Sequence, residues 1–359
     1  MVKKLEDGRE TVIQYAKKTF AALKNPCRSV VKVFPSAIDA FLEEGGPAPR
    51  YVGVKDRAEV PAALIRKLRA GNYRLHTLDA ASDGGRAVDL HLTNPVSGRP
   101  MTGSSSGTAI NVRLHINDLG VGVDGGGSVL APAMSVNLYG FVSPLIERGT
   151  MDRFSKESTD HIAFSPSVGF MTREYGGMLR AVRCALGISA VSGGKTRVFL
   201  PEDTGEQRAS ARKIRGKLDP ALETQAVPYP RLTGDRKTAI RFLSEQLERC
   251  DVLISYEGPI DTEGFGDTVF GHFDSRTALC QQNSHKGLIR VVNMVKATAL
   301  AVPDTDFACG YVLVCKSKPE KIAKMLGIAR CFATEEDPLL KTYFTRFACY
   351  FPEEFGMDF

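Results

Sequence analysis

The stretch TGSSSGTAINVRLHINDLGVGVDGGGSVLAP, residues 102–132, decides the fold, because it holds two loops rich in glycine and serine within one short window. Each loop precedes residues that can open a helix, and the strand-like run LGVGV at 119–123 lies between them. Three glycines at 125–127 let the backbone turn sharply and present several N–H groups toward one point. A helix beginning there adds positive potential, so the second loop has the geometry to hold an oxyanion beside the Ser128 hydroxyl.

Two other interpretations of the second loop stay open at this level. DGGGS also reads as a flexible turn without a chemical role. GVGVDGGG imitates a GxGxxG dinucleotide fingerprint, but Gly120 and Gly122 lie inside the strand-like run rather than after it, and no GxxxxGK[ST] pattern occurs. None of the six histidines has a distinctive setting for a general base.

The first loop, GSSSG at 103–107, supplies further hydroxyls, and Ser104 precedes Ser128 by 24 positions. A lysine can act as the base where burial lowers its pKa from about 10.4 toward neutral, and a hydroxyl between lysine and nucleophile can relay the proton. Lys55 is the candidate because it ends the apolar strand YVGVK at 51–55. As one of 47 basic residues it also reads as an ordinary solvated lysine.

Composition limits the class of protein. The chain has 359 residues, of which 43% are hydrophobic and 25% charged, so it can bury a sizeable core without disulfides or a metal. Its net charge of +6 is spread along the sequence, which argues against nucleic-acid binding. No apolar run reaches the roughly 18 residues of a membrane span, and the charged N-terminus is unlike a signal peptide. The eight cysteines are scattered without a CxxC pair, which favours a reducing compartment, and we expect a cytoplasmic protein.

Strand-like and helix-like segments alternate along the chain and predict an α/β sheet covered by helices on both faces. The first expected helix, 10–24, would bury a stripe of Val12, Ile13, Ala16, Phe20 and Leu23. A helix over 319–330 would begin with a capping box formed by Ser317 and Glu320. The remaining expected helices are 59–70, ending at Gly71, 108–116, 173–186 and 236–250, and the remaining expected strands are 196–201, 251–256 and 311–315. The region from about 201 to 234 is expected to be irregular.

Several of these motifs together resemble one family, the amidase signature enzymes. GSSSGTA resembles the family's GSSGG element, GVGVDGGGSVLAPA resembles its G-T-D-x-G-G-S-I-R-x-P-A element, and the 24-residue interval between the two serines is also the family's. YVGVKDRAEVPAALIRKLRAG, FSPSVGFMTREYGGMLRAVRCALG and CDVLISYEGP are similar to further family segments. The resemblance implies a single domain over 1–359 with a large mixed β-sheet, its catalytic core at about 50–190 and the other sheet and pocket elements at about 195–345.

The resemblance also implies a Ser–cis-Ser–Lys triad. Ser128 would be the nucleophile, Ser104 the relay serine after a cis peptide bond, and Lys55 the base. The oxyanion hole would use the N–H groups of Gly125, Gly126, Gly127 and Ser128. Ser105 would support the relay by hydrogen bonding, Asp124 would brace the loop, and Thr102 and Gly103 would bind substrate.

The sequence departs from the family's pattern in three places. The 49 positions between Lys55 and Ser104 are fewer than in the usual, longer members, so this chain is a shortened member. Leu130 replaces the arginine expected two residues after the nucleophile, and Ser106 replaces a glycine and adds a Cβ to a tight loop.

The predicted function is hydrolysis of the C–N bond of a small or medium acyl amide through a serine acyl-enzyme, with no metal or cofactor. The alternative is a non-catalytic or acyl-transferase-like relative that binds a ligand or partner protein. An amidotransferase subunit is a third reading that the short chain disfavours. The expected partner is a small-molecule amide, with no nucleic acid and no membrane, and a homodimer stays open.

Overall fold

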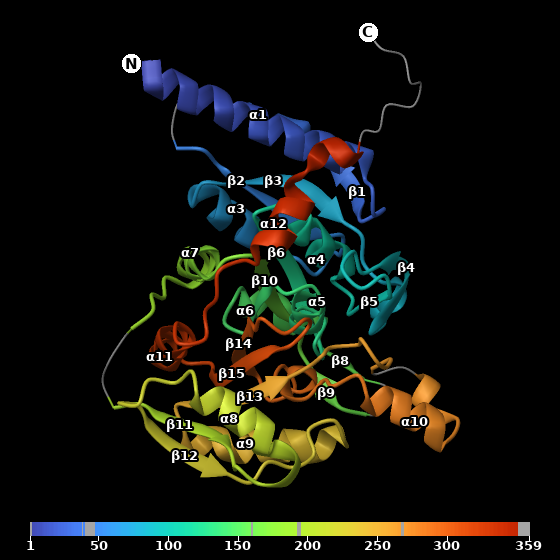
Figure 1. Cartoon of the computed structure of the whole chain (residues 1–359), viewed down its shortest axis with the longest axis vertical. Coiled ribbons are helices and arrows are strands. Elements are labelled where there is room, and N and C mark those ends of the chain that lie inside the picture. The colour runs from blue at the N-terminus through green and yellow to red at the C-terminus, as the bar shows by residue number, and fades with distance from the viewer. Residues whose placement is uncertain are drawn as a thin grey trace.

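A mixed sheet of eleven strands runs through the computed structural model, which describes residues 2–37, 39, 47–158, 161–191, 195–266 and 269–350 (Figure 1). Its strands are β1 (Val30–Val33), β2 (Arg50–Lys55), β3 (Tyr73–Asp79), β6 (Leu119–Asp124), β7 (Tyr139–Ser143), β10 (Ser167–Thr172), β11 (Arg197–Pro201), β12 (Glu223–Val227), β13 (Val252–Glu257), β14 (Ala297–Pro303) and β15 (Gly310–Lys316).

In space the strands follow the order β1-β3-β2-β6-β10-β7-β14-β15-β13-β11-β12. β2 runs parallel to its neighbours β3 and β6, and β11 runs parallel to β12 and β13. The other pairs are antiparallel. The mixed sheet predicted from the family resemblance is therefore confirmed.

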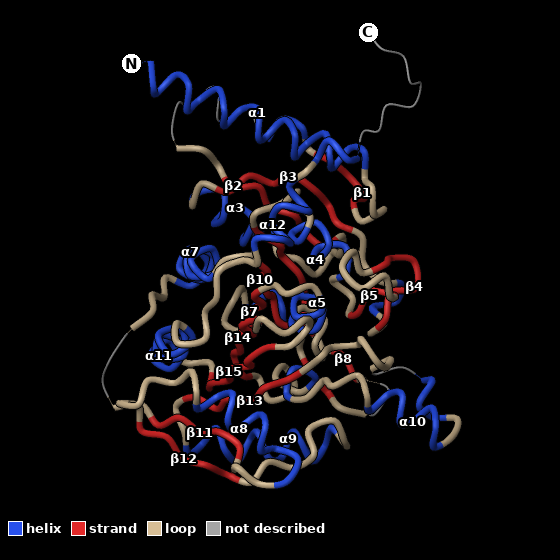
Figure 2. Tube along the Cα trace, viewed as in Figure 1, coloured by secondary structure: helices blue, strands red, loops and turns tan. Residues whose placement is uncertain are grey.

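Apolar side chains alternate between the two faces of this sheet, and helices cover both faces (Figure 2). On β14, Ala299 and Ala301 join one core cluster, whereas Leu300 and Val302 join the other, as the two-residue period of a strand requires. The helices that contribute to the first cluster are α1 (Val2–Lys24), α4 (Ser106–Arg113), α5 (Leu130–Ser135), α9 (Arg236–Arg249) and α12 (Pro338–Thr345). Those that contribute to the second are α3 (Ala62–Ala70), α6 (Arg148–Met151), α7 (Tyr175–Leu186), α8 (Arg208–Arg215) and α11 (Pro319–Ala329).

Three smaller elements lie beside the main sheet (Figure 1). β4 (Val88–Thr93) pairs with β5 (Pro100–Thr102), and β8 (Lys156–Glu157) pairs with β9 (Ala163–Phe164), both antiparallel. The third is α10 (Ser275–Gln282), whose Asp274 and Thr277 form a capping box. None of the helices in the described ranges combines the length and apolar character that crossing a bilayer requires.

The expected helix at 10–24 is present within α1, but its predicted buried stripe is wrong. Phe20 and Leu23 are 57% and 61% exposed, whereas Tyr15, Ala21 and Ala22 are buried. Polar and aromatic contacts orient the helix instead. Lys18 Nζ lies 2.6 Å from Asp118 Oδ1, and the Tyr15 ring packs on that of Tyr51, with 4.5 Å between the centroids.

The expected capping box at the start of α11 is also wrong. Lys318 occupies the N-cap position and makes no side-chain cap hydrogen bond. The Ser317 hydroxyl instead donates to the backbone oxygen of Lys296, at 2.8 Å. The strand β15 ends at residue 316 and directs Ser317 toward the neighbouring strand β14 rather than toward the helix.

Candidate active site

The Lys55 side chain lies buried at the end of β2, where the apolar run YVGV before it enters the sheet between β3 and β6. Its Nζ atom donates to Ser104 Oγ at 2.7 Å and to the Val123 backbone oxygen at 3.4 Å. Burial, followed by repulsion from the Arg57 guanidinium, lowers the pKa of the Lys55 ammonium from 10.5 to about 8. A fraction of this lysine is therefore a neutral amine, able to accept a proton, near neutral pH.

The glycine loop that follows β6 is folded around the carboxylate of Asp124, which is 1% exposed. This carboxylate accepts backbone N–H groups from Gly127 at 2.8 Å, Val129 at 2.7 Å and Leu130 at 3.4 Å. Burial raises the pKa of the Asp124 carboxyl, while these N–H groups and Lys55 oppose the rise. Asp124 thus holds the loop closed from inside, in the place where a bracing role was expected.

One of the four expected oxyanion donors is already occupied. The Gly127 N–H donates to Asp124 Oδ1, which removes it from the set available to a ligand and leaves those of Gly125, Gly126 and Ser128. Gly127 has φ +96°, a conformation that a residue with a Cβ rarely adopts. Gly127 therefore allows the backbone of the loop to turn and does not offer its N–H to an oxyanion. The Ser128 side chain is partly exposed at the end of this turn.

The two serine loops contact each other through their backbones. Ser105 N–H donates to the Ser128 backbone oxygen at 3.2 Å. In the part of the chain that the structure describes, no hydrogen bond joins the Ser104 hydroxyl to that of Ser128. Lys55, Ser104 and the backbone of the Ser128 loop are nonetheless brought together from three separate segments.

Two expectations about the first loop are corrected. The cis peptide bond within the described residues is Gly258–Pro259, so the bond before Ser104 is trans; a cis bond without proline costs about 3 kcal/mol, and Gly103 with φ +70° makes the turn instead. The Ser105 hydroxyl has no hydrogen-bond partner among the described residues and lies against Gly122, so it does not extend the relay. Ser105 acts here through its backbone.

The extra side chain at position 106 is accommodated by a partner. Ser106 Oγ donates to Asp89 Oδ2 at 2.5 Å, and both residues are buried. Leu130 is likewise fully buried in the core, where an arginine would have to desolvate its charge. Both departures from the family's pattern are therefore compatible with an ordered loop.

The expected substrate-binding residues face the protein interior. Thr102 is 1% exposed, and its hydroxyl donates to the Ala87 backbone oxygen at 3.4 Å. Gly103 donates its N–H to the same oxygen at 2.6 Å, and a Cβ on it would clash with Pro132. Thr102 and Gly103 therefore hold the first serine loop in place through the Ala87 oxygen.

A turn from a distant part of the chain lies against the glycine loop. A Cβ on Gly127 would stand 3.2 Å from the Ile289 backbone oxygen, and one on Gly126 would stand 3.4 Å from that of Arg290. On another side, a Cβ on Gly125 would stand 2.6 Å from the Phe164 ring. Glycine is required in this loop because backbone oxygens and an aromatic ring occupy the space that Cβ atoms would need.

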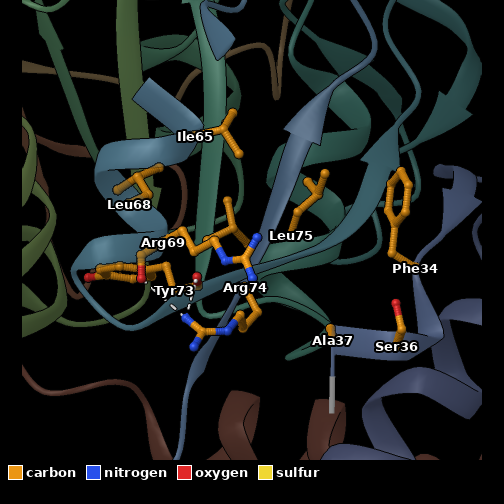
Figure 3. A pocket seen from close by; sticks show the side chains of 10 residues that line it. Phe34, Ser36, Ala37, Ile65, Leu68, Arg69, Tyr73, Arg74 and Leu75 are labelled. Atoms are coloured by element: carbon orange, nitrogen blue, oxygen red, sulfur yellow. Dashed lines mark hydrogen bonds between the residues drawn. The ribbon is translucent and has the colours of Figure 1, made fainter. Parts of the chain in front are cut away.

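Two cavities in the described part of the chain are lined by other residues. One, of about 320 Å³, is lined mainly by the segment 34–37, α3 and β3, and the Arg74 guanidinium in its wall donates to the backbone oxygens of Arg69 and Tyr73 (Figure 3). The other, of about 350 Å³, lies at the carboxyl end of β13, where Ser255, Tyr256 and Glu257 line part of it. Neither is lined by Lys55, Ser104 or Ser128.

Comparison with known proteins agrees with the motifs. The family model described as Amidase matches residues 91–254, which include both serine loops. Over this matched segment the chain is similar to the amidase family. No curated protein sequence matches the chain.

Solved structures of amidase signature enzymes share the fold. A crystal structure of an amidase is 18% identical, with a TM-score of 0.61, over 91% of this chain and 98% of that one. A bacterial aryl acylamidase of the amidase signature family is 14% identical, with a TM-score of 0.60, over 96% of both chains. The 6-aminohexanoate cyclic dimer hydrolase is 14% identical, with a TM-score of 0.60, over 90% of this chain and 92% of that one.

The structure also adds residues that sequence reasoning missed. Asp89 holds the Ser106 hydroxyl, Arg57 lowers the pKa of Lys55, and Phe164 packs on Gly125. Only Arg57 carried a signal in the sequence, since it lies two residues after the candidate base. The others depend on contacts between segments that no local pattern pairs.

Proposed function

We propose that this protein is an amidohydrolase that cleaves the C–N bond of a small or medium acyl amide through an acyl-enzyme on Ser128. The observation that supports it most is the buried hydrogen bond of 2.7 Å between Lys55 Nζ and Ser104 Oγ. A lysine whose pKa is lowered to about 8 and whose amine is held on a serine hydroxyl has the properties of a general base with a relay.

The proposed reaction has two halves. Ser128 Oγ attacks the amide carbonyl carbon, and its proton passes through Ser104 to the Lys55 amine, while the carbonyl oxygen takes the negative charge beside the glycine-loop N–H groups. The C–N bond then breaks, and the leaving amine takes the proton from Lys55. Water attacks the acyl-enzyme in the second half, gives its proton through the same relay, and Ser128 Oγ leaves with a proton as the acid departs.

In this proposal the N–H groups of Gly126 and Ser128, with that of Gly125, are the oxyanion donors. Asp124 keeps the loop in shape, because three backbone N–H groups end on its carboxylate. The substrate class is the amides of carboxylic acids, in line with the aryl acylamidase and the cyclic dimer hydrolase that share the fold. We propose that the protein acts in the cytoplasm on small molecules and requires neither metal nor cofactor.

The test is labelling with a fluorophosphonate probe, followed by a screen of aliphatic, aromatic and amino-acid amides. The folded wild-type protein should be labelled, Ser128→Ala should not, and Ser317→Ala should be labelled like the wild type because its hydroxyl binds the Lys296 backbone oxygen on another part of the fold. Absence of labelling in a folded wild type contradicts the proposal.

One observation keeps the second candidate function in view. The trans bond before Ser104, and the absence of a hydrogen bond between the Ser104 and Ser128 hydroxyls among the described residues, fit a relative that binds a ligand without turning it over, or one that passes an acyl group to an acceptor. Hydroxylamine separates the cases. A hydrolase releases acid without any added acceptor, an acyl transferase turns over only when hydroxylamine is present to take the acyl group as hydroxamate, and a binding protein yields neither product.

A further inference from the structure

A buried amide side chain connects the glycine loop to the strand beside it. Asn293 is 2% exposed and lies on the turn that follows the 3₁₀ helix Leu288–Arg290. Its Nδ2 donates to the Ser165 backbone oxygen at 2.8 Å and to the Gly125 backbone oxygen at 3.4 Å. Its Oδ1 accepts the Ser167 hydroxyl. All the polar atoms of this side chain are therefore engaged.

The orientation of the Asn293 amide follows from its partners. Backbone oxygens only accept hydrogen bonds, so the end of the amide that faces the two carbonyls of Gly125 and Ser165 must be the NH₂ group. The other end is then the oxygen, and the Ser167 hydroxyl donates to it. The geometry admits no flipped alternative in which both carbonyls keep a donor.

The contact between Asn293 and the Gly125 backbone oxygen orients a whole peptide unit of the loop. A trans peptide unit is planar, so its C=O and N–H point in opposite directions, and the C=O of Gly125 shares its unit with the N–H of Gly126. A peptide between two glycines rotates easily, because neither residue has a Cβ. Holding the Gly125 oxygen on Asn293 therefore directs the Gly126 N–H away from Asn293.

Asp124 fixes the next peptide unit in the same way, by accepting the Gly127 N–H at 2.8 Å. The two successive peptide units of the glycine loop are thus oriented by two buried side chains from opposite parts of the chain. The Asp124 carboxylate engages the Gly127 N–H, which is therefore not available to the oxyanion hole. The Asn293 amide sets the direction of the Gly126 N–H through its contact with the Gly125 oxygen.

The turn that carries Asn293 is itself held in place. The buried Glu257 carboxylate accepts the N–H groups of Gly287 at 2.7 Å and Leu288 at 2.8 Å, and also the Ser255 hydroxyl at 2.7 Å. The carbonyls of Ile289 and Arg290 then pack against the glycine loop. This support lets a single amide position a backbone group precisely.

We infer that Asn293 is a positioning residue of the oxyanion hole, which holds the Gly126 N–H in the direction needed to stabilise the tetrahedral intermediate. This inference rests on the proposed function. Removing an oxyanion donor outright lowers kcat by about 10²–10³-fold in comparable hydrolases, so releasing one from its fixed orientation should cost about 10–100-fold.

The experiment compares Asn293→Ala and Asn293→Asp with the wild type on the best amide substrate from the screen. Asp keeps the size of the side chain and can accept the Ser167 hydroxyl, but it offers no N–H to Gly125. Both variants should lower kcat by about 10–100-fold with KM changed by less than about threefold. A boronic acid analogue of the acyl group, which mimics the tetrahedral state, should bind more weakly by the same factor, whereas the product acid should bind as before.

Asn94 provides the matched control. It is 5% exposed, donates from Nδ2 to the Ser135 backbone oxygen at 2.8 Å and accepts the Val96 N–H at 2.9 Å, so it is also a buried amide that connects two segments. Asn94→Ala should lower the melting temperature and leave kcat and boronate affinity within about twofold of the wild type.

The outcomes distinguish this inference from the proposed function. An active wild type whose kcat is unchanged in both Asn293 variants, or falls only as much as in Asn94→Ala, overturns the positioning role and leaves the amidase. A wild type that hydrolyses no amide and takes no fluorophosphonate overturns both. If the Asn293 variants do not fold, Ser167→Ala loosens the same amide more gently, and it should lower kcat by several-fold with KM unchanged; an unchanged kcat refutes the inference.

Discussion

Replacing Lys55 with methionine should stabilise the fold while it destroys activity. The lysine is 5% exposed, and its pKa falls from 10.5 to about 8 on folding, so below pH 8 the folded protein carries a buried charge. At 1.36 kcal/mol for each pH unit, this charge costs about 3 kcal/mol. Loss of the hydrogen bond to Ser104 destabilises the variant by about 1 kcal/mol. Lys55→Met should therefore be about 2 kcal/mol more stable than the wild type at pH 7.

The sign of the pH dependence follows from the same values. Between pH 8 and 10.5 the folded lysine is neutral while the unfolded one still binds a proton, so the wild type gains stability as the pH rises. The advantage of Lys55→Met should therefore shrink by about 3 kcal/mol from pH 7 to about 10.5 and reverse in sign near the top of this range.

Urea unfolding of both proteins at each pH measures this difference, in which the titration of all other groups cancels. Lys17→Met is the control for the loss of a charge, because Lys17 is exposed on α1. Parallel curves for the wild type and Lys55→Met from pH 7 to 10 would refute the reasoning, since they would show that Lys55 keeps an ordinary proton affinity in the folded state.

Four further changes test the site. Arg57→Ala removes the positive charge that helps to lower the pKa of Lys55, so the rising limb of kcat/KM should move to higher pH; a limb that stays in place argues against Lys55 as the titrating base. Asp124→Asn weakens the acceptor of three loop N–H groups, and it should cost about 2 kcal/mol in urea unfolding and at least 10-fold in kcat. Gly127→Ala adds a Cβ at φ +96°, 3.2 Å from the Ile289 oxygen, so it should destabilise by about 1–3 kcal/mol; wild-type stability would show that the loop relaxes freely. Incubation with EDTA should leave amide hydrolysis unchanged, and loss of activity restored by a metal would contradict the metal-free mechanism.

The sequence predicted those strands and helices whose own residues show a clear apolar run or a helical period. The apolar run at 51–55, the glycine-flanked run at 119–123 and the helices at α7, α9 and α11 all appear within a few residues of the expected bounds. Six strands of the sheet were not anticipated, namely β1, β3, β7, β10, β12 and β14, and β12 lies in the region that was expected to be irregular. β14 reads ATALAVP, and its side chains are buried on both faces, so it shows no two-residue period of apolar and polar residues.

Residues of the candidate site that belong to a short motif were predicted from the sequence. Contacts made by residues distant in the sequence were not. The Lys55–Ser104 contact was implied by the resemblance to the family, and the structure places the two atoms at hydrogen-bond distance. The use of the Gly127 N–H by Asp124 was not foreseen, because backbone direction within a glycine run has no side-chain signal. Asn293 is separated from Gly125 by 168 positions, and an asparagine in a turn is ordinary in any sequence.

That separation has a consequence for how activity is acquired. In the proposed mechanism, the loop that bears the attacking Ser128 oxygen is supported by a turn 168 positions later in the sequence, so a chain truncated before this turn contains Lys55, Ser104 and Ser128 but lacks the Asn293 contact to Gly125. Under this proposal Ser128 would become fully active only when the turn that carries Asn293 has packed on the glycine loop, and recovery of catalysis on refolding would report that this distant contact has formed.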